Sequence, residues 1–274
     1  MHDNATTNPL PGIRTSTLTR RLLAPNAGPM TLEGTNSYLI SASAGTEAAS
    51  APVVIVDPGP DHAGHLAALA AAGRVQLVLI THHHVDHTAG SAALARLTGA
   101  PVRALDPAFC IGGDPLTDGE LIEAAGTRIR VVHTPGHTAD SVCFFLPDDG
   151  PAGSVLTGDT ILGRGTTIIG YPDGTLTDYL HSLETLRALG PATVLPAHGP
   201  TLPDLAVVGT AYLAHRRQRL DEVRAALTAL GPQATAEQVT DIVYADTDAA
   251  VRFAAEASVR TQLAHLRGAG GDPA

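Results

Sequence analysis

The chain has 274 residues, of which 44% are hydrophobic and 16% are charged, and its formal net charge is −10 at pH 7. This length predicts one large domain or a domain with a small appendage, and the composition excludes a disordered or coiled-coil protein. The two cysteines, Cys110 and Cys143, exclude a disulfide scaffold and a cysteine-only zinc module. All 17 basic residues are arginine, which excludes any mechanism that needs a catalytic lysine.

Charge and hydropathy restrict the expected location of the protein and the class of substrate that it binds. The acidic balance argues against a broad phosphate-binding surface. The first residues contain no basic segment followed by an apolar run, and no stretch approaches about 18 uninterrupted apolar residues. We therefore expect no signal peptide and no membrane span, which makes a cytoplasmic location the default. The oligomeric state stays open, with a homodimer as one option.

Short aliphatic runs and helical spacing alternate along the first 204 residues. Residues 1–12 are predicted to form a mobile tail. Strands are predicted over 36–40, 53–56, 77–80, 127–133, 142–146 and 193–195, with a further apolar run over 154–156, and helices over 65–72, 90–97 and 178–189. This alternation, with some hairpin-like pairs, predicts an α/β protein whose sheets are covered by helices.

The pattern changes at about residue 205, after which no strand is predicted. Helical apolar spacing runs over 211–230, 236–244 and 249–266, and Gly231-Pro232 separates the first two segments. We therefore predict a catalytic domain over 13–204 and a small helical C-terminal domain over 205–274.

One motif carries the chemistry. Residues 81–87 read Thr-His-His-His-Val-Asp-His and directly follow the buried run 77–80. Imidazole and carboxylate groups are the usual ligands of zinc and related ions. In an extended segment His82 and His84 point to the same side. Asp86 and His87 turn toward a second position where the chain bends into the next helix. The motif therefore predicts a metal site at the end of a strand.

Two ions need more ligands than this motif provides, and three later residues are candidates. His137 lies in HTPGHT, Asp159 in LTGDT and His198 in LPAHGP. Each follows a predicted strand and precedes or lies in a loop that contains glycine or proline. Such loops meet at one edge of a sheet scaffold, so we expect a site of seven ligands there.

In their order along the chain, these motifs resemble the ligand motifs of the metallo-β-lactamase superfamily. H-x-H-x-D-H, the GH of PGHT, the GD of TGDT and the AHG near residue 198 match, and Asp57 in VDPG matches an early aspartate that supports the site. The resemblance covers about residues 14–204. It implies an αββα sandwich with two metal ions at one edge of two packed sheets.

The resemblance also implies a role for each ligand. His82, His84 and His137 would hold one ion, Asp86, His87 and His198 the other, and Asp159 would bridge them. The ions would be two divalent cations, zinc first, with manganese or iron also compatible with a set that lacks thiolate. A hydroxide shared by the ions would attack an acyl carbon or a phosphorus. Asp86, Asp159 and Asp57 are the predicted catalytic carboxylates, with Asp57 orienting a ligand histidine.

A finer resemblance involves the β-lactamase-like protein 2 group. GTNSYLI at 34–40, GDTILGRGTT at 158–167 and DYLHSLETL at 178–186 are similar to that group. AYLAHRRQRLDEV at 211–223 and TAEQVTDIVY at 235–244 resemble its winged-helix C-terminal domain. We predict that Arg164 lines the entrance of the site, and that His215 and Arg216 bind an anionic substrate at its mouth.

Two substrates fit this resemblance. Single-stranded RNA is favoured by the winged-helix-like tail and by an arginine series, Arg216, Arg217, Arg219 and Arg224, whereas the net charge of −10 opposes it. An acyl thioester of a carrier protein or coenzyme A is compatible with the acidic balance. The alternatives are a glyoxalase II-like thioesterase or a weak β-lactamase and, outside enzymes, a catalytically silent metal-site binding module.

Overall fold

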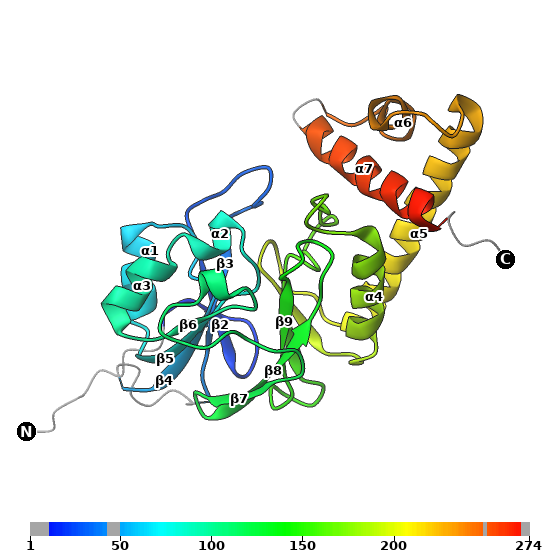
Figure 1. Cartoon of the computed structure of the whole chain (residues 1–274). Helices are drawn as coiled ribbons and strands as arrows, with labels where there is room; N and C mark the ends of the chain where they lie inside the picture. Colours follow the sequence, from blue (N-terminus) through cyan, green and yellow to red (C-terminus); the bar gives the residue numbers. More distant parts are fainter. Residues whose placement is uncertain (1–10, 43–49, 249–250, 270–274) are drawn as a thin grey trace, which may run out of the picture.

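The computed structural model describes residues 11–42, 50–248 and 251–269, so nearly all of the predicted tail over 1–12 lies outside the described residues. Two sheets pack face to face, with helices on both outer faces and a helical region at one end (Figure 1). No helix in the described part of the chain is long and apolar enough to cross a membrane.

The first sheet is built from the N-terminal half. Its order is β1 (Ile13–Arg14), β2 (Thr19–Leu23), β3 (Asn36–Ile40), β4 (Pro52–Val56), β5 (Arg74–Leu79) and β6 (Val102–Arg103). The strands are antiparallel from β1 to β4 and parallel from β4 to β6. Helices α1 (Ala63–Ala70) and α3 (Ser91–Thr98) provide the crossovers between the parallel strands.

The second sheet follows in the sequence. Its order is β11 (Thr193–Pro196), β10 (Ser154–Gly158), β9 (Val142–Leu146), β8 (Thr127–His133) and β7 (Leu121–Ala124). Strands β7 to β10 pair antiparallel, whereas β10 and β11 are parallel and are joined through helix α4 (Leu176–Arg187). A short helix α2 (Val85–Thr88) and a 3-10 turn (Pro107–Phe109) lie in the loops of the first half.

Three apolar layers hold the sandwich together. The layer between the sheets contains Tyr38 and Leu79 from the first sheet and Phe144 from the second, all nearly without exposure. Leu66 of α1 packs in the layer outside the first sheet, and Leu183 of α4 in the layer outside the second. Burying one such side chain is worth about 1.5–3 kcal/mol. The predicted αββα architecture is confirmed.

The C-terminal region consists of helices α5 (Leu205–Leu230), α6 (Ala236–Val243) and α7 (Arg252–Ala269). The first part of α5 lies along α4, and its second part extends beyond the sandwich to meet α6 and α7 (Figure 1). Val223, Val239 and Val259 join the three helices in a core of their own. The predicted helical region is therefore present. Its described residues contain no strand, so the likeness to a winged helix is limited to the helices.

Candidate metal centre

The predicted ligands lie on loops at one edge of the two sheets. The loop after β5 carries the H-x-H-x-D-H motif, and the loops after β8, β10 and β11 carry His137, Asp159 and His198. Because β4 runs parallel to β5, and β10 to β11, the chain leaves each pair of strands on one side. The structure therefore brings all seven predicted ligands together.

The first motif changes conformation in its middle. His82 and His84 lie in the loop between β5 and α2, which begins at Val85. Asp86 lies in the first turn of α2 and His87 in its last turn. This bend points the two halves of the motif in different directions, as the sequence predicts.

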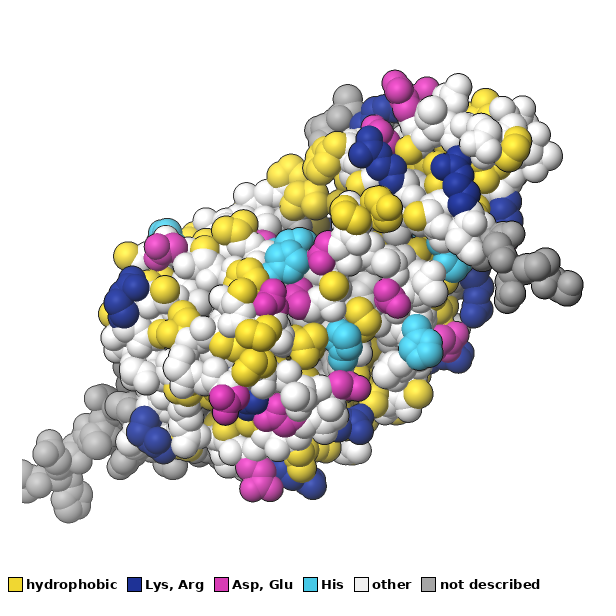
Figure 2. All heavy atoms as spheres, viewed as in Figure 1, with side chains coloured by type: hydrophobic (Ala, Val, Ile, Leu, Met, Phe, Trp, Pro, Cys, Tyr) yellow, Lys and Arg dark blue, Asp and Glu magenta, His cyan; other side chains and the backbone are white. Residues whose placement is uncertain are grey.

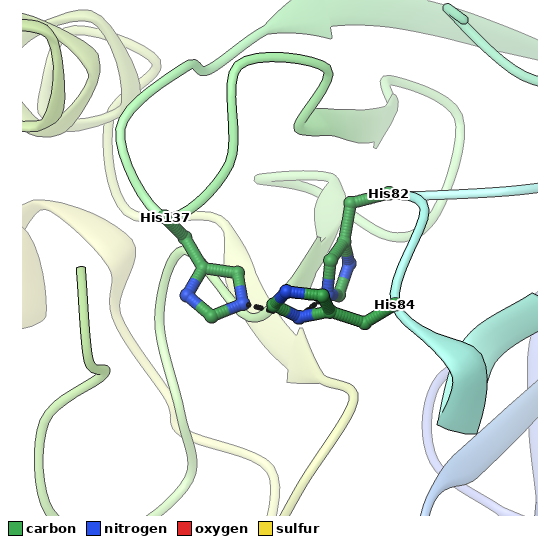
Figure 3. Close-up of side chains that lie close together, drawn as sticks. All are labelled: His82, His84 and His137. Carbon is green, nitrogen blue, oxygen red and sulfur yellow. Dashed lines mark hydrogen bonds between the residues drawn. The ribbon is translucent and has the colours of Figure 1, made fainter. Parts of the chain in front are cut away.

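Three imidazoles form a first cluster. His84 Nδ1 lies 3.0 Å from His82 Nε2 and 3.0 Å from His137 Nε2. Figure 3 shows the three rings converging, with His137 approaching on a separate loop from the other two. Each neutral imidazole has one donor and one acceptor nitrogen, so a single shared hydrogen cannot satisfy three nitrogens, whereas one cation can.

Asp86, His87 and His198 form a second cluster. Asp86 Oδ2 lies 3.4 Å from His87 Nε2 and 3.2 Å from His198 Nε2. Both imidazoles are fully buried, while the Asp86 side chain is 24% exposed. The solvent-facing side of this cluster is therefore a carboxylate, which a substrate can approach.

Asp159 lies between the two clusters. Its Oδ1 atom is 3.4 Å from His198 Nε2 and 3.7 Å from His87 Nε2. Its Oδ2 atom is 3.7 Å from His137 Nε2. Each carboxylate oxygen thus faces a different cluster, which is the arrangement that a bridging ligand requires.

Between the two clusters, several buried polar atoms have no hydrogen-bond partner in the described part of the chain and could bind cations. His87 Nε2, His198 Nε2 and Asp159 Oδ1 are buried without a hydrogen-bond partner among the described residues. Buried polar atoms are nearly always paired in proteins, so three orphans at one point indicate a missing binding partner. Nitrogen and carboxylate donors suit zinc, manganese and iron.

The two clusters differ in their electrostatics. Burial, together with the neighbouring His137 and His83, lowers the pKa of His84 to about 4, and burial holds the pKa of His82 well below its ordinary value. Burial also disfavours the charged form of His87, but the carboxylates of Asp57 and Asp159 outweigh it and hold its pKa well above the usual range. The first cluster therefore offers neutral imidazoles, and the second attracts positive charge.

Comparison with known proteins decides the family. A model described as the Metallo-beta-lactamase superfamily matches residues 30–198, which include all seven ligands. The chain belongs to the metallo-β-lactamase superfamily. The resemblance inferred from the sequence motifs is confirmed.

Two relatives of this protein are similar to it in sequence, but the match covers different shares of their own lengths. A Beta-lactamase-like protein 2 homolog of Caenorhabditis elegans is 31% identical over 90% of this chain and 83% of its own. An Atrochrysone carboxyl ACP thioesterase of Aspergillus fumigatus is 34% identical over 68% of this chain, and the match spans 57% of its own length. Membership of this family, together with these relatives, identifies the chain as a metal-dependent hydrolase.

Solved structures agree on the fold. A beta-lactamase domain protein from Burkholderia ambifaria has a TM-score of 0.77 at 21% identity, covering 97% of this chain and 91% of that one. A metallo-beta-lactamase family protein from Thermus thermophilus has a TM-score of 0.73 at 23% identity, covering 92% and 94%. A third, solved in a di-iron-bound form, is 27% identical over 68% of this chain and 95% of that one, with a TM-score of 0.52.

Asp57 supports ligands of both clusters without facing either centre. Its Oδ2 atom accepts from His87 Nδ1 at 2.9 Å and from Thr81 Oγ1 at 2.7 Å, and Oδ1 accepts from the Thr81 amide at 2.8 Å. Thr81 Oγ1 in turn lies 3.1 Å from His82 Nδ1. Asp57 therefore orients the His87 imidazole directly and the His82 imidazole through Thr81, and it leaves their Nε2 atoms free for a metal. Asp57 holds this place at φ +53°, a strained backbone conformation for a residue with a side chain.

Backbone carbonyls orient two other ligands. His137 Nδ1 lies 2.6 Å from the Ile168 carbonyl oxygen, and His198 Nδ1 lies 3.2 Å from that of Gly34. These contacts direct both Nε2 atoms to the centre, as Asp57 does for His87. The sequence does not predict these contacts, because a backbone carbonyl carries no side-chain signal. Thr81 was missed as well, although it directly precedes the motif.

The predicted substrate-binding residues lie in different surroundings. Arg164 is exposed and pairs with Glu33 at 2.7 Å. His215 is half-buried on α5, and burial, followed by Arg216 and Arg219, lowers its pKa. A substrate contact of Arg164 or His215 stays a prediction.

Arg216 differs from its prediction. It is only 4% exposed, its Nη2 atom donates to the Thr167 carbonyl at 2.5 Å, and its guanidinium lies 4.9 Å from the centre of the Tyr179 ring. The side chain points into the protein because α5 packs this face against α4. A guanidinium so enclosed is not available at the mouth of the site.

Proposed function

We propose that the protein is a hydrolase with two divalent ions that cleaves an acyl thioester of a carrier protein or coenzyme A. The observation that carries this choice over RNA is that each arginine of the α5 series is either buried or paired with a carboxylate of this chain. The seven convergent ligands and the relationship to a carboxyl ACP thioesterase support the reaction class.

Each arginine of the series that favours RNA has a partner within the chain. Arg217 pairs with Glu184, Arg219 with Glu222 and Arg224 with Asp221, at 3.3, 2.6 and 2.7 Å, and Arg216 is buried. On the face drawn in Figure 2, the basic side chains lie apart from one another and among acidic ones. Tight RNA binding needs a basic surface that neutralises several phosphates. This chain, with a net charge of −10, offers little of that kind.

Apolar side chains near the ligands favour an acyl group. Val85 is 73% exposed and lies between the ligands His84 and Asp86 on α2. Tyr171 is 57% exposed and follows Gly170, whose amide donates to the His137 carbonyl at 3.4 Å. Exposed apolar side chains beside a polar centre suit a substrate with an apolar part at the reacting bond.

The chain's own residues would hold and orient the reacting groups. Two bound divalent ions would lower the pKa of a water and polarise the acyl oxygen. The imidazoles of His87, His137 and His198 keep their Nδ1 hydrogens on fixed acceptors, so their Nε2 lone pairs stay directed at the centre. Asp159 keeps the two clusters in register through its two oxygens. A thiol has an ordinary pKa near 8.5, so it leaves as thiolate with little need for a proton donor.

Zinc is the proposed metal, and manganese and iron fit the same donors. The absence of cysteine among the seven ligands removes the preference of thiolate sites for zinc. The di-iron form of one similar structure makes iron the first alternative to test.

The proposal is tested by a substrate panel on metal-loaded protein. An aromatic acyl-coenzyme A, an unstructured RNA oligomer, S-lactoylglutathione and a chromogenic β-lactam are compared, with Asp159→Ala as the inactive control. We expect release of free coenzyme A at a rate at least about a hundredfold above that control, with the RNA intact. RNA cleavage by the wild type, without thioester hydrolysis, would overturn the thioesterase assignment in favour of a phosphodiesterase.

A further inference from the structure

The segment that orients His137 has little support from its own backbone. Residues 164–169 lie between β10 and α4 in neither helix nor strand. Among the described residues, no backbone–backbone hydrogen bond involves this segment, although the flanking Gly163 and Gly170 each donate one. Its conformation must therefore be held by side chains of other elements.

Three successive carbonyl groups of this segment accept hydrogen bonds from three different parts of the chain. The Thr167 carbonyl accepts from Arg216 Nη2 of α5 at 2.5 Å. The Ile168 carbonyl accepts from His137 Nδ1 at 2.6 Å. Thr261 Oγ1 of α7 lies 3.2 Å from the Ile169 carbonyl oxygen and shares its single hydrogen between this acceptor and the Ala257 carbonyl at 3.0 Å. The two carbonyls that flank the His137 acceptor are thus bound by the C-terminal helices.

We propose that Arg216 and Thr261 are positioning residues for the metal ligand His137, and that the C-terminal helices thereby help to form the first metal site. The proposal rests on the two-ion site of the proposed function. It replaces the substrate contact that the sequence predicts for Arg216.

Arg216 is itself held in place. Its guanidinium lies over the Tyr179 ring, and the Tyr179 hydroxyl donates to the Thr160 carbonyl at 2.7 Å. Thr160 directly follows the ligand Asp159. The hydroxyl of Tyr212, also on α5, donates to the Gly165 carbonyl at 2.9 Å. Residues from α4 and α5 therefore fix the loop from Asp159 onward, and the rigid guanidinium fork completes the arrangement.

The consequence for the metal is specific to one site. His137 Nδ1 lies 2.6 Å from the Ile168 carbonyl and 3.2 Å from the Thr167 hydroxyl, and both belong to this segment. If the segment moves, both acceptors move with it, and the Nε2 lone pair of His137 is no longer held toward His84. Outer contacts of this kind are typically worth 10–100-fold in metal affinity. The second cluster depends on Asp57 and on the Gly34 carbonyl, which the C-terminal helices do not contact in these hydrogen bonds.

The experiment measures metal binding rather than turnover. Zinc is titrated in competition with a chromophoric chelator into metal-free wild type, Arg216→Met and Thr261→Val, and Co²⁺ absorption spectra report the ligand geometry. Arg217→Met is the matched control, since it removes the neighbouring arginine, which is exposed and pairs only with Glu184 among the contacts described. The melting temperature of each metal-free protein reports whether it is folded.

We expect one of the two zinc affinities to fall about 10–100-fold in Arg216→Met, and less in Thr261→Val, with the other affinity and the Arg217→Met control within about threefold of wild type. Unchanged affinities in a folded Arg216→Met or Thr261→Val protein would overturn the proposal, and so would an equal loss at both sites. If Arg216→Met does not fold, Thr261→Val decides. A wild type that binds fewer than two ions would instead overturn the proposed function.

Discussion

The two sheets contribute to the metal centre in different ways. The first sheet supplies four ligands within six residues, at the end of β5 and in the short helix α2. The second sheet supplies three ligands on three loops, after β8, β10 and β11. The first contribution is compact and is supported by Asp57, which directly follows the neighbouring strand β4. The second is spread over about 60 residues and is held from outside by α4, α5 and α7.

The geometry of the site therefore has two different sources. A motif on adjacent residues inherits its geometry from one strand end and one helix turn. Ligands on separate loops have no such common frame, so each loop needs its own fixing contacts. The C-terminal helices supply part of that fixing, which gives this region a role at the centre without a direct contact to it.

The largest effect is expected at the ligand that joins the two contributions. Asp159→Ala removes the carboxylate that faces both clusters. We expect kcat/KM to fall about a thousandfold, equivalent to about 4 kcal/mol in the barrier, and the metal content to fall below two ions per chain. Steady-state kinetics and elemental analysis measure both. Asp61→Ala, at an exposed position, is the control. Full activity in Asp159→Ala would contradict a site with two ions.

The next prediction compares Asp57, which positions ligands after the first sheet, with Arg216, which acts on a ligand after the second. Asp57→Asn keeps the shape of the side chain but weakens its hold on His87 and, through Thr81, on His82. Because these ligands belong to different clusters, we expect both metal affinities to fall about 10–100-fold, whereas Arg216→Met affects one. Chelator competition measures each affinity. If Asp57→Asn lowered the affinity for only one of the two ions, the proposed difference between the two sheets would be wrong.

Backbone packing beside the ligands offers a third test. A Cβ atom at Gly136, where φ is +140°, would lie 2.4 Å from Tyr179 Cα of helix α4. A Cβ atom at Gly99, at the end of α3 with φ +71°, would meet nothing within 4 Å. We expect Gly136→Ala to lower the free energy of unfolding by more than about 2 kcal/mol and Gly99→Ala by about 1 kcal/mol. Urea unfolding measures both, and equal losses would show that the loop of His137 is not packed as described.

The smallest effect concerns a buried histidine of the first half. His65 lies 2.9 Å from Ser37 Oγ, and burial, followed by the charge of His62, lowers its pKa to about 4. An unfolded histidine titrates near 6.5, so between these values the unfolded state binds more protons. The stability due to neutral His65 is full above about pH 6.5 and is lost as the pH falls toward 4. The difference in unfolding free energy between metal-free wild type and His65→Gln should therefore be smaller at pH 5 than at pH 7.5. A difference that does not change with pH would contradict this assignment.

Much of the scaffold could be predicted from the sequence. The predicted bounds 36–40, 127–133 and 142–146 are those of β3, β8 and β9. Residues 127–133 alternate between polar and apolar side chains, and the other two strands are short runs with apolar side chains. The strand β2 was missed, since Arg20 and Arg21 interrupt its apolar pattern. The helix α5 begins at Leu205 instead of 211, and the missed signal is Asp204, whose side chain caps the helix by accepting from the Val207 amide.

The parts of the site that consist of side chains could be predicted from the sequence. The ligand positions follow from histidine and aspartate at strand ends, but the carbonyls of Gly34 and Ile168 act through atoms that every residue has. Arg216 could not be placed from helical spacing, because one arginine in a charged segment looks the same whether it faces solvent or a neighbouring helix. The packing of α5 on α4 decides that question.

The most direct test of the two-ion centre is an anomalous diffraction map of zinc-loaded crystals. We expect two strong peaks, one bounded by His82, His84 and His137 and the other by Asp86, His87 and His198, with Asp159 between them. A single peak, or two peaks bound by other residues, would contradict this arrangement.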